Sequence, residues 1–87
     1  MSYFQDNIAE LNLLMHFDLS SSQRGIKIHQ SADSSVIAAA RSLFEKGLIT
    51  QEDGGYLTEI GLTAAEHTHL LYSELNGPVL RNRVSHR

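Results

Sequence analysis

The chain has no cysteine, no tryptophan and a single proline among its 87 residues. The absence of cysteine excludes disulfide bridges and thiolate metal sites. No apolar run approaches the roughly 20 residues that a membrane-spanning helix requires, so we expect no membrane partner. The N-terminal MSYFQDN lacks a basic region ahead of an apolar one, which is not the pattern of a secretion signal. A cytoplasmic location is the default expectation.

Basic residues are scarce in the body of the chain. Residues 1–80 hold ten acidic side chains against four basic ones, whereas the last seven residues add Arg81, Arg83 and Arg87. The length allows a single core, so we predict one domain over residues 1–77 and a flexible basic tail over residues 78–87. Nucleic-acid-binding proteins usually present a basic face, because neutralising phosphates supplies most of their affinity. The acidic body therefore argues against nucleic-acid binding.

Apolar spacing predicts a first helix over residues 6–17, with Asp6 as its N-cap. The apolar stripe of this helix is wide, and that of the last predicted helix, from Thr58 to the Gly77-Pro78 stop, is equally wide. A stripe too broad for one core indicates a second contact. We therefore expect a homodimer that forms through the first and last helices.

The segment QRGIKIHQ, residues 23–30, fits two patterns. Ile26 and Ile28 alternate with Lys27 and His29 as in a short strand, whereas Ser20 or Ser21 could cap a helix there. We predict a short helix, because the helix that follows then has one packed across it.

Residues 34–58 have the clearest local pattern in the chain. Asp33 or Ser34 caps an alanine-rich helix that runs to about Lys46, and Gly47 suits the left-handed residue that ends helices. Residues 48–50 and 56–57 are short β-prone runs around Gly54-Gly55, which can adopt the positive φ of a tight reversal. Thr58 caps the last helix. The chain is thus predicted to be mainly α with a small β-hairpin.

The stretch SSVIAAARSLFEKGLITQEDGGYLTEIGLTAAE resembles the recognition helix, wing and following helix of winged helix-turn-helix proteins of the MarR/PadR type. Leu43, Lys46-Gly47-Leu48-Ile49, Tyr56-Leu57-Thr58 and Gly61 carry the resemblance. The chain is also compatible with a small bacterial family of unknown function. The resemblance implies a winged helix-turn-helix fold and a small DNA-binding transcriptional regulator.

The resemblance also implies a set of DNA contacts. The helix over residues 34–46 would enter the major groove of double-stranded DNA. Bases would be faced by Ser34, Ser35 and Ala38, and phosphates would be touched by Arg24, Lys27, Arg41 and Lys46. None of the three base-facing residues makes the bidentate contact that discriminates bases most strongly. The wing tip carries Glu52 and Asp53, which would lie against phosphates.

The alternative function is a winged-helix protein–protein interaction or dimerisation module without DNA affinity. It is favoured by the acidic body and by the apolar character of Ile37 and Ala38 on the same helix. Ile37 and Phe44 are expected in the core, and their exposure would favour a protein partner. His67 and His69 lie two apart on one helix and cannot share a metal on one face. We expect no enzyme activity, no cofactor and no metal.

Overall fold

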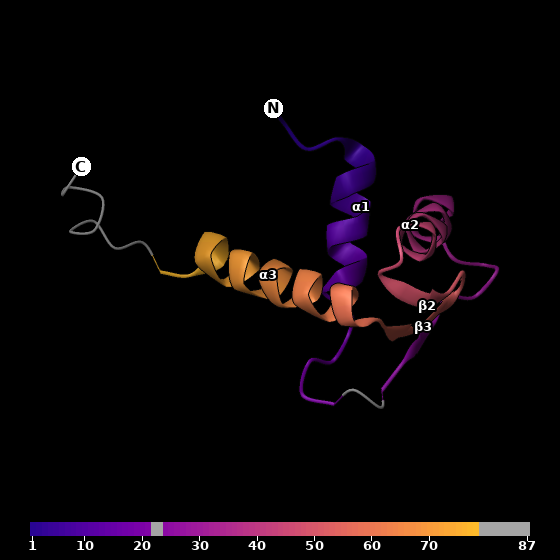
Figure 1. Cartoon of the computed structure of the whole chain (residues 1–87). Helices are drawn as coiled ribbons and strands as arrows, with labels where there is room; N and C mark the ends of the chain where they lie inside the picture. The colour runs from indigo at the N-terminus through magenta and orange to yellow at the C-terminus, as the bar shows by residue number, and fades with distance from the viewer. Residues whose placement is uncertain (22–23, 79–87) are drawn as a thin grey trace.

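The computed structural model describes residues 1–21 and 24–78. The described residues form three helices and a small antiparallel sheet, with the strands lying between the helices in the sequence (Figure 1). Their bounds are α1 Gln5–Leu14, β1 Ile26–Lys27, α2 Ser34–Glu45, β2 Ile49–Gln51, β3 Gly54–Leu57 and α3 Glu59–Asn76. The mainly helical fold class predicted from the sequence is confirmed, and the arrangement is compatible with a winged helix.

The sheet has three strands in the order β1-β3-β2, one more than the predicted hairpin. The β2–β3 hairpin turns at Glu52 and Asp53, and Gly54 and Gly55 then follow with φ of 124° and 75°. Residues with a side chain rarely adopt these positive φ values, which explains why both positions are glycine. On its other edge β3 pairs with β1, where Ile26 lies opposite Gly55.

The helix predicted over residues 23–30 is wrong, because Ile26 and Lys27 form β1 instead. The alternation of apolar and polar residues there indicated a strand correctly. Pairing with the edge of β3 stabilises this strand. The Ile28 amide extends the contact by donating to the Asp53 carbonyl at 2.7 Å. Residues 28–33 form only a turn before α2. The described chain therefore has no helix immediately before α2 to complete a helix-turn-helix.

The ends of the helices largely follow the local signals. Asp33 is the N-cap of α2, Gly47 ends it with φ of 79°, and Thr58 caps α3 by accepting a hydrogen bond from the Gly61 amide at 3.0 Å. The predicted Asp6 cap of α1 is wrong. Phe4 occupies the N-cap position, and its amide donates to the Asn7 carboxamide oxygen.

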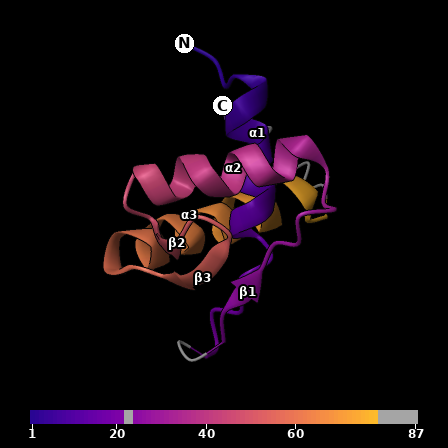
Figure 2. The same cartoon turned by 90° about the vertical axis from the view of Figure 1, so that its right-hand side faces the viewer.

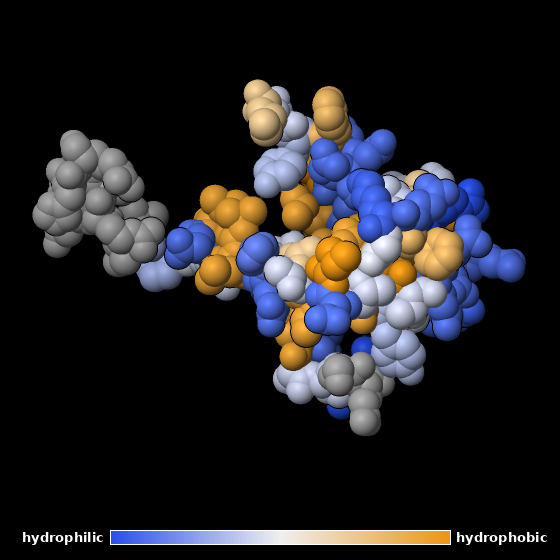
Figure 3. All heavy atoms as spheres, viewed as in Figure 1, coloured by the Kyte–Doolittle hydropathy of each residue, from blue (hydrophilic) through white to orange (hydrophobic). Residues whose placement is uncertain are grey.

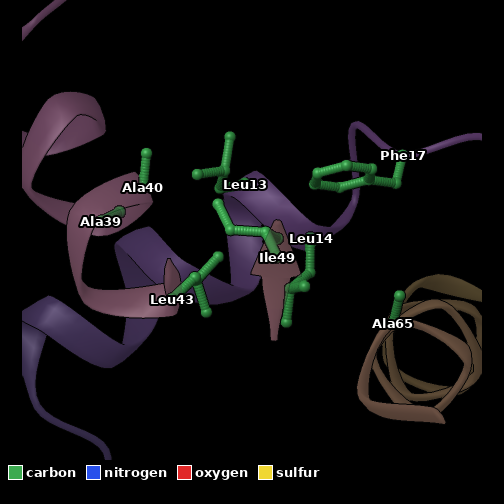
Figure 4. Packing of buried hydrophobic residues seen from close by; sticks show 8 residues of the cluster. All are labelled: Leu13, Leu14, Phe17, Ala39, Ala40, Leu43, Ile49 and Ala65. Carbon is green, nitrogen blue, oxygen red and sulfur yellow. The ribbon is translucent and has the colours of Figure 1, made fainter. Parts of the chain in front are cut away.

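The hydrophobic core lies where α1 and α2 cross above the sheet and α3 closes one side (Figure 2). Side chains from α1, the turn after it, α2, β2 and α3 converge there (Figure 4). They are Leu13, Leu14, Phe17, Ala39, Ala40, Leu43, Ile49 and Ala65. The expectation that Phe44 lies in the core is wrong, since 40% of its surface is exposed, while Ile37 is half-buried.

Candidate functional site

All seven residues predicted to contact DNA are exposed, but the structure does not gather them into one surface. Ser35 and Ala38 line a depression between α2 and the start of α1, beside Asp6. Arg41 lines a separate depression on the wing side of α2, with Ile37 and the turn after β1. The others, also exposed, are Arg24 before β1, Lys27 in β1, Ser34 at the first position of α2 and Lys46 at its C-cap.

Every lysine and arginine in the described residues pairs with a carboxylate. Arg24 Nη1 lies 3.5 Å from Asp18 Oδ2, and Arg41 Nε lies 3.6 Å from Glu52 Oε1. Lys27 Nζ pairs with Asp53 at the wing tip, and Lys46 Nζ lies 2.6 Å from Glu10 Oε2. The two wing carboxylates predicted to repel phosphates therefore also neutralise the cations nearest to them.

The carboxylates of two exposed pairs are held in their charged form. The hydrogen bond from Lys27 lowers the pKa of Asp53. At Asp18, hydrogen bonds from the Ser20 hydroxyl and amide lower the pKa, with Arg24 adding a smaller attraction. Both aspartates are therefore ionised at neutral pH, and neither pair leaves a net positive charge.

The fourth pair belongs to a buried polar network between α1 and α2. Glu10 is only 7% exposed, and its carboxylate accepts hydrogen bonds from Asn7 Nδ2 at 3.1 Å, Ser42 Oγ at 2.7 Å and Lys46 Nζ at 2.6 Å. Burial by itself raises the pKa of Glu10, but the hydrogen bonds from Lys46, Ser42 and Asn7 outweigh it and lower the pKa overall. Lys46 is thus occupied in joining the two helices.

This network makes a prediction about acid sensitivity. The pKa of Glu10 is lower in the folded than in the unfolded chain. The contribution of Glu10 to the free energy of unfolding is therefore present above the unfolded pKa of about 4.3, and it is lost as pH falls through the folded pKa. At pH 7 we expect Glu10→Gln to lower the free energy of unfolding by about 1–3 kcal/mol. Denaturant unfolding measured from pH 7 to pH 3 should show this difference shrinking toward acid. A difference that stays constant over that range would contradict the assignment.

The second candidate surface is an apolar groove between α1 and α3. It is lined by Ile8, Leu11, Asn12, Met15, Thr68, Leu71, Tyr72 and Leu75, with a volume of about 140 Å³. None of these residues is charged. Figure 3 shows apolar surface along the projecting end of α3 and beside α1. The sequence indicated this surface only through the wide apolar stripes of the two helices.

Residues 1–21 and 24–78 were also compared with the geometry of metal sites and of membrane-spanning helices. No three histidine, aspartate or glutamate side chains come together there as a metal site. None of the helices in this part of the chain is both long and apolar enough to cross a membrane. The three arginines of the predicted tail, Arg81, Arg83 and Arg87, lie outside the described residues.

Comparison with known proteins identifies the family but no function. No curated protein and no solved structure matches the chain. A family model described as a family of unknown function, DUF5669, matches residues 1–76, which end at the last residue of α3. Since the match covers most of the chain, the protein belongs to the DUF5669 family of unknown function.

Proposed function

We propose that this protein is a protein–protein interaction module with a winged-helix-like fold, and that its folded part does not bind duplex DNA. The observation that carries the proposal is the groove between α1 and α3, in which six of the eight lining residues are apolar or aromatic and none is charged. Contact surfaces between proteins are depleted of charge at their centre and enriched in tyrosine, methionine and other large apolar residues. Met15 and Tyr72 in this groove fit that composition.

The ion pairs support the second half of the proposal. An exposed pair contributes only about 0–1 kcal/mol, so a cation could leave its partner for a phosphate at little cost. The abandoned carboxylate would stay next to the phosphate and repel it, which removes most of the gain. For Lys46 the cost is larger, because leaving Glu10 would strand a buried charge.

DNA binding remains the second candidate, and a specific observation favours it. Ser34, Ser35 and Ala38 are exposed at the N-terminal end of α2, and α2 is followed by a hairpin and a capped helix as the MarR/PadR resemblance implies. The absence of a helix in residues 28–33 weakens this candidate. The preceding helix of a helix-turn-helix would position α2 on DNA, and here only a turn precedes it.

Fluorescence anisotropy with a labelled duplex tests the two candidates. We expect a version that ends at Pro78 to bind with a dissociation constant weaker than about 100 μM at physiological salt. Any tighter binding by the full chain should disappear with the tail. Binding by the shortened version that weakens steeply with salt would overturn the proposal, because it would place phosphate contacts on the folded part.

A variant without the two wing carboxylates shows whether the assay can detect phosphate contacts made by the folded part. Glu52→Gln combined with Asp53→Asn removes the carboxylate partners of Arg41 and Lys27. In the shortened chain we expect this variant to bind DNA more tightly at low salt than the unaltered protein does. Equal binding by the two would mean that the ion pairs do not explain the weak affinity.

A further inference from the structure

We infer that the groove between α1 and α3 is the contact surface for a second copy of this chain, related by a two-fold axis. The inference rests on the proposed function and names the partner. The groove consists of Ile8, Leu11, Asn12, Met15, Thr68, Leu71, Tyr72 and Leu75.

The packing of α3 is uneven along its length. Its buried residues are Gly61, Ala65 and Thr68, which lie on one side of its N-terminal part. After Thr68 the helix has no buried residue, although it continues through Asn76. In Figure 1 this second part extends away from α1 and the sheet. Eight residues correspond to roughly 12 Å of helix, which is long enough to reach another molecule.

The projecting part of α3 carries exposed apolar side chains. It exposes 38% of Leu71, 54% of Tyr72 and 73% of Leu75, which all line the groove. On α1, Ile8 is 49% exposed. Leaving this much apolar surface in water is unfavourable, and a contiguous patch of this kind typically marks an interaction site.

The charge of the groove favours a second copy over a basic partner. Residues 1–80 contain ten acidic residues and only four basic ones, so two copies repel each other wherever their carboxylates meet. A face without charged residues avoids this repulsion, and the groove is such a face. A basic protein would be recognised by carboxylates in the groove, and the groove contains no carboxylate.

The shape of this surface suits a two-fold dimer. The protein carries both an apolar groove and a projecting apolar helix end, and Leu71, Tyr72 and Leu75 belong to both. In a two-fold dimer the same patch is used on both subunits, so the helix end of each copy can cover the groove of the other. One contact then covers both unpartnered surfaces.

The size of the patch sets the expected affinity. A standard interface takes about 20–30 residues from each partner, whereas the eight residues of the groove are about a third of that number. We therefore expect a dimer with a dissociation constant in about the micromolar range.

Sedimentation velocity across about 1–200 μM tests the inference on the full chain and on the version that ends at Pro78, a range that brackets the expected constant. Both should change from monomer to dimer as concentration rises. Leu71→Glu combined with Leu75→Glu places like charges in the groove and should weaken association by more than about 100-fold. The matched control is Ile60→Glu, which adds a charge at an exposed site of α3 outside the groove and should dimerise normally. Circular dichroism verifies that each variant keeps its helices.

The outcomes separate this inference from the proposed function. A protein that stays monomeric at every concentration, or a Leu71→Glu, Leu75→Glu variant that still dimerises, overturns the inference. Dimerisation lost only with the tail also overturns it, because the contact would then lie outside the groove. None of these results gives the folded part DNA affinity, so the anisotropy experiment decides the absence of DNA binding independently.

Discussion

Gly61→Ala is expected to destabilise the domain by about 3–5 kcal/mol. A Cβ at this position would lie 1.8 Å from the Leu48 carbonyl oxygen and 2.8 Å from its carbonyl carbon. Both atoms are backbone, so no side-chain rotation can relieve the overlap. The same Leu48 carbonyl accepts the Thr58 amide at 3.1 Å, and the Gly61 amide donates to the Thr58 hydroxyl. Moving the two segments apart would weaken the start of α3.

Equilibrium unfolding in urea measures this effect, and Gly47→Ala is the matched control. Gly47 has a positive φ, but no atom lies within 4 Å of the place that a Cβ would take, so alanine there meets only the left-handed backbone penalty of about 1–2 kcal/mol. Gly61 lies in α3 without a positive φ, so alanine there meets only the steric overlap with the Leu48 backbone. If Gly61→Ala unfolds within about 1 kcal/mol of the unaltered protein, the close approach of α3 to Leu48 is wrong.

Leu43→Ala is expected to cost about 2–5 kcal/mol of unfolding free energy. Leu43 is 1% exposed and lies at the centre of the core, among residues from α1, α2 and β2 (Figure 4). A domain of this length has a total stability of about 4–13 kcal/mol, so the loss is a large fraction of it. The variant should show a clearly lower urea midpoint.

The neighbouring Phe44→Ala provides the control, because it removes a larger side chain from the same helix. Phe44 is 40% exposed, and we expect its truncation to cost no more than about 1 kcal/mol. The sequence pattern places both residues on one apolar stripe, whereas the structure buries only Leu43. A greater loss at Phe44 than at Leu43 would contradict this packing.

The exposure of Phe44 illustrates where periodicity stops being informative. The apolar stripe of α2 is wider than the contact that α1 and the sheet provide, so the residues at its margin are left at the surface. The same holds for α1 and α3, whose wide stripes predicted a second contact and whose outer parts form the groove. A stripe indicates which residues seek burial, and the arrangement of neighbours decides which of them obtain it.

The predicted contact residues show a similar division. Their exposure could be predicted, because all of them are polar or small and because Ala38, Arg41 and Lys46 lie opposite the apolar stripe of the helix predicted over residues 34–46. Their pairing could not, since Lys27 meets Asp53 across the sheet and Lys46 meets Glu10 from another helix. These partners are 26 and 36 residues apart in the chain. No local pattern connects them, and it is their pairing that changes the favoured function.

The sequence by itself determined the features that depend on neighbouring residues: the stop of α2 at Gly47, the positive φ of Gly54 and Gly55 after the hairpin turn, and the cap at Thr58. Each follows from short-range sterics or from a hydrogen bond within three residues. Tertiary structure decided the features that need a distant partner. Residues 26–27 became a strand because the edge of β3 was available to them, and Glu10 became buried because Lys46 and Ser42 could satisfy its charge.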